Sequence, residues 1–146
     1  MGTSLLDNHI LWASLLAWGI AQLSKTIYEF IRQRKLNFSR LVSSGGMPSS
    51  HSALVTGLAT ATGRVSGLNS SAFAITVVLA AIVMYDAAGV RRAVSIQARI
   101  LNQMIDEVFQ GRPMGEKRLR ELIGHTPIQV IVGGLLGIGI ALLVTA

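Results

Sequence analysis

Long apolar stretches separated by polar and basic segments divide this 146-residue chain. Three of them, at about 9–24, 71–90 and 127–146, approach or reach the roughly 20 helical residues that a bilayer core requires. A fourth, at about 52–68, is shorter and rich in Gly, Ala, Ser and Thr, which let helices pack closely in lipid. Charged residues make up only 14% of the chain, against about 25% in soluble domains. We therefore expect an all-α fold, a polytopic membrane helical bundle of about four transmembrane helices, forming a single integral membrane domain over residues 1–146.

The segment from 91 to about 109 has a different pattern, with apolar residues on one helical face and charges elsewhere. The residues at helical spacing are Val94, Gln97, Leu101, Met104 and Val108, and the stripe is widened by Ile96, Ile100 and Ile105. We interpret the segment as an amphipathic interfacial helix at the membrane surface. The alternative is an ordinary helix packed on its own bundle.

Basic residues gather in two segments of the chain. Five of the 13 Lys and Arg residues lie between the first and second apolar stretches, and seven lie between the third and fourth, leaving only Arg64 elsewhere. With four spans, both basic segments fall on one side, which the positive-inside rule makes cytoplasmic, with both termini outside. The net charge of +6 is then explained by anionic lipid head groups, and no nucleic-acid partner is expected. The chain has no Cys, which excludes thiolate chemistry and a Cys-based zinc site.

The segment from 43 to 52, which we call the Ser-rich loop, is polar, contains two glycines and opens a predicted helix. Ser49, Ser50 and Ser52 supply hydroxyls, and the helix start supplies free N–H groups, an arrangement that attracts phosphate. His51 lies within it and can transfer a proton near neutral pH. The alternative interpretation is a helix cap with an incidental histidine.

A second candidate centre is His125, just before the fourth span and on the same predicted face as His51. If the helix extends back to His125, Gln129, four residues on, would share a helix face with it and fix the orientation and tautomer of its ring. Taken alone, His125 is more often an interface residue than a catalyst. Because both histidines begin helices on the face that carries the basic segments, we expect them to share one phosphate site.

Asp86, inside the third apolar stretch, is the third candidate. A carboxylate in a span is costly and needs a partner. Offsets of five and six residues keep Arg91 and Arg92 off its helix face, so the partner is expected on another helix, with Lys25 or the Ser-rich loop as candidates. The alternative role is a structural ion pair. Arg91 and Arg92 either anchor the helix end or bind phosphate, for which the guanidinium is well shaped.

Three segments together resemble one family, and the resemblance spans nearly the whole chain. They are residues 45–53, 85–92 and 124–127. The chain resembles the divergent branch of the type 2 phosphatidic-acid phosphatase superfamily, described as acid phosphatase and vanadium-dependent haloperoxidase related.

The superfamily has three phosphate-site motifs, and the first two match in part. In the first, a Lys is followed after six residues by Arg-Pro; Lys25 and Arg32 match this spacing, with Gln33 in the Pro place. The second, Pro-Ser-Gly-His, resembles Pro48-Ser49-Ser50-His51, with Ser50 in the Gly place.

The third motif has an Arg, then a His, then an Asp four residues beyond it. His125 matches the His, Gln129 stands where the Asp is expected, and Leu119 stands where the Arg is expected. Arg91 or Arg92 are candidates to replace that Arg in space.

The resemblance implies a membrane phosphatase that hydrolyses a lipid or isoprenoid phosphate monoester without a metal or cofactor. His125 would attack phosphorus and form a phosphohistidine, and His51 would protonate the leaving oxygen and then help to activate water. Asp86 joins the two histidines as a candidate catalytic residue. The phosphate-binding residues would be Lys25, Arg32, Ser49, Ser50, Arg91 and Arg92. The alternative is a non-enzymatic membrane protein that binds or moves phosphorylated lipids or organises a membrane complex.

Overall fold

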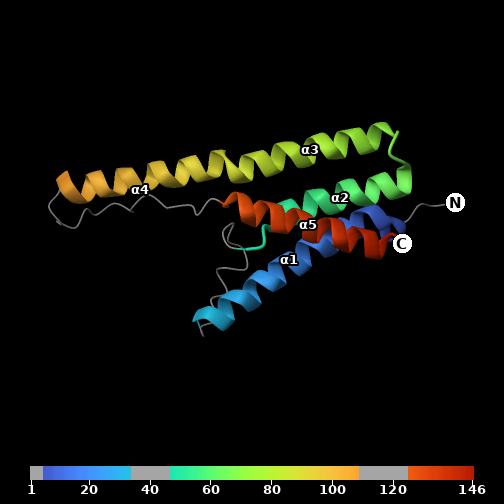
Figure 1. Cartoon of the computed structure of the whole chain (residues 1–146), viewed down its shortest axis with the longest axis horizontal. Coiled ribbons are helices and arrows are strands. Elements are labelled where there is room, and N and C mark those ends of the chain that lie inside the picture. Colours follow the sequence, from blue (N-terminus) through green and yellow to red (C-terminus); the bar gives the residue numbers. More distant parts are fainter. Residues whose placement is uncertain (1–4, 34–46, 109–124) are drawn as a thin grey trace.

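The structure, a computed structural model, describes residues 5–33, 47–108 and 125–146. These residues form the 3-10 turn η1 (Leu5–Asp7) and the helices α1 (His9–Gln33), α2 (Ser50–Ser66), α3 (Ser71–Ala88), α4 (Val90–Val108) and α5 (Pro127–Val144). Helices α1, α2, α3 and α5 lie side by side, while α4 continues α3 away from them (Figure 1). The all-α helical bundle expected from the sequence is confirmed. Residues 43–46 of the Ser-rich loop and Leu119 lie outside the described residues.

Helix α2 is the inner helix of the bundle and packs against α1, α3 and α5. Within the described residues, three segments qualify as candidate spans by length and hydropathy: His9–Tyr28, Ser71–Ala88 and Pro127–Val144. The 17-residue α2 is more polar, and its buried residues are mainly Ser, Thr, Ala and Gly. Because neighbouring helices surround it, its hydroxyls bond to backbone carbonyls instead of facing lipid. The bundle therefore has about four transmembrane helices. One of them, α2, is packed inside the others, as its small residues predict.

Helices α1 and α2 pack antiparallel in a regular register. Ala13 and Ala61 share one buried cluster, and Ala21 and Ala53 share another. Between these levels, a Cβ placed on Gly57 would lie 3.0 Å from the Cβ of Ala17. Four residues forward along α1 therefore correspond to four residues back along α2.

Helices α2 and α5 run parallel and approach each other through glycine. A Cβ on Gly133 would collide with the backbone of Ser49, and one on Gly137 would collide with the Ala53 carbonyl and the Thr56 hydroxyl. The Thr56 hydroxyl lies 2.9 Å from the carbonyl oxygen of Gly134 and 2.8 Å from that of Ser52, so its proton is shared between both helices. The Gly-rich segment of the fourth span is thus a close-packing face, as expected.

Helices α3 and α4 are separated by a single residue, Gly89. Ser70 caps α3 by accepting a hydrogen bond from the Phe73 N–H at 3.1 Å. At the other end, the Gly89 N–H donates to the Tyr85 carbonyl at 2.8 Å, and the chain continues directly into α4. The two helices form an almost straight rod (Figure 1). The amphipathic helix predicted after the third span is therefore present, and among the described helices its main contacts are with α3.

Candidate functional site

The start of α2 is set back within one end of the bundle. The Ser49 N–H donates to the Gln129 carbonyl at 3.1 Å, and the Ser49 backbone fills the space beside Gly133. Gly133 lies six residues after the start of α5. The start of α2 is therefore displaced by about 9 Å along the axis of α5, from the first residue of α5 toward its C-terminus. The segment carrying His51 is therefore bonded directly to the helix that follows His125.

Three buried serines cap and open α2. Ser49 is the N-cap residue, and its hydroxyl accepts from the Ser52 N–H at 3.4 Å. The Ser52 hydroxyl donates to the Ser49 hydroxyl at 3.0 Å. Ser50 is the first helical residue and is also buried. The positive end of the helix dipole and its N–H groups thus lie together with hydroxyls in a place shielded from solvent.

Lys25 of α1 lies at the same height along the bundle axis as Ser49, the N-cap of α2. It follows Ala13, Ala17 and Ala21 at steps of four residues, on the face that packs against α2. Extending the α1–α2 register by one further step places Lys25 level with Ser49. Its side chain is only 2% exposed, and the ammonium lies 3.5 Å from Gln22 Oε1. A buried ammonium in a membrane helix is costly, which favours an anionic or polar partner at this level.

His125 is held by the cap of α5. Thr126 is the N-cap residue, and a capping box joins it to Gln129 through the Thr126 N–H at 3.1 Å from Gln129 Oε1. The same oxygen lies 3.3 Å from His125 Nδ1, and His125 is 2% exposed. Because Oε1 is an acceptor for Thr126, it is also an acceptor toward Nδ1–H. Of the two neutral tautomers, this contact favours the one with the proton on Nδ1 and the lone pair on Nε2.

His51 and Asp86 lie near this end of the bundle and are half-buried. His51 is the second residue of α2. Asp86 is in the last turn of α3, two residues after Met84, whose Cε lies 3.4 Å from the Cβ position of Gly134. Both therefore belong to the helix ends around the start of α2. Pairing of Asp86 across helices stays a prediction.

The three predicted phosphate-binding arginines occupy helix ends. Arg32 is in the last turn of α1, and Arg91 and Arg92 are in the first turn of α4. The end of α1, the junction of α3 and α4, and the start of α2 lie toward the same end of the bundle (Figure 1), while the side chains of the three arginines lie outside the described part of the chain.

Gly133, which lies outside the predicted site residues, shapes this end by letting α2 and α5 meet. Ser52, predicted only as a hydroxyl of the loop, bonds to the cap of α2. The sequence signals were the run of serines after Pro48 and the Gly pair in the fourth span, each recognised for a general property rather than for this contact.

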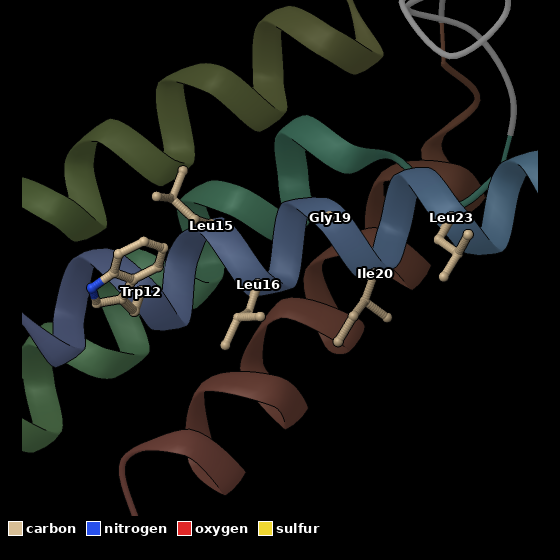
Figure 2. Close-up of a pocket in the computed structure, with 6 residues that line it drawn as sticks. All are labelled: Trp12, Leu15, Leu16, Gly19, Ile20 and Leu23. Carbon is tan, nitrogen blue, oxygen red and sulfur yellow. The ribbon is translucent and has the colours of Figure 1, made fainter. Parts of the chain in front are cut away.

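An apolar hollow lies elsewhere, along the outer face of α1. Its volume is about 240 Å³, and Gly19 provides the gap, since nothing lies within 4 Å of its Cβ position. This face is opposite the one that carries Ala17, Ala21 and Lys25. Figure 2 shows its lining residues, which are Trp12, Leu15, Leu16, Gly19, Ile20 and Leu23. The hollow contains no group that binds phosphate.

Three apolar helices around a small-residue inner helix define a polytopic helical membrane protein. The chain belongs to the divergent PAP2 family, whose family model matches residues 6–140. It is 43% identical over 145 residues to the uncharacterized membrane protein YuiD of Bacillus subtilis strain 168, covering 92% of each chain. No solved structure matches.

Proposed function

We propose that this protein is a membrane phosphatase that hydrolyses a lipid or isoprenoid phosphate monoester through a phosphohistidine intermediate. The observation that carries the proposal is the hydrogen bond from the Ser49 N–H to the Gln129 carbonyl. It joins the helix start that bears His51 to the helix that positions His125. Membership of the divergent PAP2 family supports the same chemistry.

The phosphate would lie at the start of α2. Lys25, level with Ser49, supplies a buried positive charge, and the first N–H groups of α2 supply donors. The hydroxyls of Ser49 and Ser50 add polar contacts. Arg32, Arg91 and Arg92, at the neighbouring helix ends, would neutralise the outer phosphate oxygens.

His125 would act as the nucleophile and His51 as the acid. The Nε2 lone pair of His125 forms a bond to phosphorus while the bond from phosphorus to the ester oxygen breaks. Protonated His51 gives its proton to the leaving oxygen and becomes neutral. It then takes a proton from water as the water oxygen attacks the phosphohistidine, which releases phosphate and restores both histidines. The carboxylate of Asp86 would pair with a positive charge or orient a neighbouring side chain at this end of the bundle.

The cytoplasmic face is our proposed location for this site. Both long basic segments join the helix ends where Ser49, Lys25 and His125 lie. Helix α1 begins and α5 ends at the opposite end of the bundle (Figure 1), which supports an even number of crossings. The positive-inside rule then orients the site toward the cytoplasm.

One observation favours the second candidate function, a non-enzymatic protein that binds or moves phosphorylated lipids. Gln129 contacts His125 Nδ1 where a carboxylate would stabilise the imidazolium. Gln129 orients the ring but supplies no charge. In serine proteases, loss of the corresponding carboxylate costs about 10⁴ in rate.

Phosphate release by the purified protein in detergent tests the proposal. Phosphatidic acid and isoprenoid phosphates are the substrates, and His125→Ala is the variant. His9→Ala is the matched control, because His9 is exposed and lies at the opposite end of α1. We expect release by the wild type and by His9→Ala and none by His125→Ala. Equal release by both variants would refute the assignment, and tight binding without release would favour the second candidate.

A further inference from the structure

One face of α4 carries exposed apolar residues in a regular spacing. Val90, Val94, Leu101 and Met104 lie at steps of four, seven and three residues, and Gln97 falls between Val94 and Leu101. The four apolar side chains are between 42% and 56% exposed, and Ile96 and Ile100, at 50% and 46%, widen the apolar face on one side of this row. Alternating steps of three and four residues form the seam of a coiled coil. We call the five residues of this row the α4 seam.

The α4 seam lies beyond the membrane core. Helix α3 has 18 residues and α4 has 19, and together with Gly89 they form a rod of about 57 Å. The hydrocarbon core of a bilayer is about 30 Å thick. The α4 half of the rod extends beyond the other helices of the bundle (Figure 1). Since α3 is long enough to fill the core by itself, we infer that α4 lies past it. An apolar seam in water is unfavourable and calls for a partner.

We propose that the partner is the α4 seam of a second copy of this chain, in a parallel two-stranded coiled coil. Every copy crosses the bilayer in the same orientation, so the α4 helices of two copies emerge on one side and point the same way. Identical seams at identical heights then pair in register. This inference does not depend on the proposed phosphatase activity.

The position of Gln97 favours a second copy over the bilayer surface as the occupant. Against lipid, its amide would lie in the middle of the apolar face, away from hydrogen-bond partners. In a parallel pair, the two Gln97 amides face each other and can bond, which also fixes the register.

Disulfide cross-linking in native membranes tests the proposal, and the absence of Cys makes every introduced thiol unique. Val94→Cys and Leu101→Cys place a thiol in the seam. Gln103→Cys is the control, because it is exposed and lies about 160° around the helix from Leu101. We expect oxidation to convert most of the two seam variants to dimers and little of the control. No dimer at the seam, or equal dimer at all three positions, would overturn the proposal.

A second measurement distinguishes the bilayer surface as occupant. A fluorophore attached to Leu101→Cys, with the labelled chain diluted among unlabelled copies in vesicles, is exposed to lipids brominated near the head group. The paired helix predicts quenching no greater than at Gln103→Cys. Strong quenching at position 101 alone would place the seam in lipid and reject the second copy.

Discussion

The backbone N–H of Ser49 bonds to the carbonyl oxygen of Gln129 at 3.1 Å, although 80 residues separate them in the sequence. Gln129 also contacts His125 Nδ1 and the Thr126 N–H through its side chain. One residue of α5 therefore links the start of α2, the cap of α5 and the candidate nucleophile. Displacing any of these three is expected to disturb the others.

Gly133 should be intolerant of a side chain. Gly133→Ala places a Cβ against the Ser49 backbone, which cannot move aside as a flexible side chain would. We expect a loss of about 1–3 kcal/mol in the free energy of unfolding and a fall in phosphate release. Gly139→Ala is the control, since nothing lies within 4 Å of its Cβ position. Thermal unfolding in detergent measures both, and equal Tm values for the two variants would contradict the contact.

The cap of α5 should matter for activity beyond its effect on stability. Thr126→Ala removes the hydroxyl that accepts from the Gln129 N–H and frees the turn that carries His125. Ser70→Ala removes the corresponding cap of α3 at the other end of the bundle. Each is expected to cost about 0.5–2 kcal/mol of stability. Only Thr126→Ala should also lower kcat; a similar kcat for both would show that the cap does not position His125.

Gln129→Glu should raise the rate. Glu keeps the length of Gln, so its carboxylate can accept from the Thr126 N–H and from His125 Nδ1 at once. The charge stabilises the imidazolium, and we expect an increase on the order of ten-fold or more in kcat. Asp, the residue of the superfamily motif, is one methylene shorter and would give up the capping bond. Gln129→Ala should lower kcat, and a rate unchanged by both substitutions would exclude an orienting role.

Lys25 should bind the anion rather than support the fold. Lys25→Met replaces a buried ammonium with an apolar side chain of similar length, which is often neutral or stabilising in a buried site. The lost charge-assisted contact, worth about 1.5–3 kcal/mol, predicts a 10- to 100-fold weaker affinity for phosphate esters. Arg64→Gln, an exposed basic residue near the other end of α2, should change neither property. An unchanged affinity in Lys25→Met would remove Lys25 from the site.

The sequence predicted the helices and the neighbourhood of His125 well, because both depend on local spacing. Apolar run length identified α1, α3 and α5. The contact between His125 and Gln129 was expected from a shared helix face, but α5 begins at Pro127, and the contact comes instead from the capping turn that precedes it. The axial displacement of the start of α2 relative to the start of α5 was not predictable. It depends on which glycine of α5 meets which residue of α2, and a single sequence does not specify the register between two helices.

The burial of Lys25 was also not predictable from a single sequence. Its spacing from Arg32 suggested a phosphate ligand, but its burial follows from the alanines at steps of four that turn its face toward α2. The direction of α4 was likewise open, since its amphipathic spacing fits a helix at the membrane surface and a helix packed on its own bundle equally.

Trapping the covalent intermediate tests the central claim most directly. The purified protein is mixed with a lipid phosphate carrying a radioactive phosphorus atom and quenched within the first turnover. The account predicts an acid-labile, alkali-stable label on His125 that persists in His9→Ala, disappears in His125→Ala and, with a good leaving group, accumulates in His51→Ala. Phosphate release without a labelled histidine, or a label that survives His125→Ala, would contradict it.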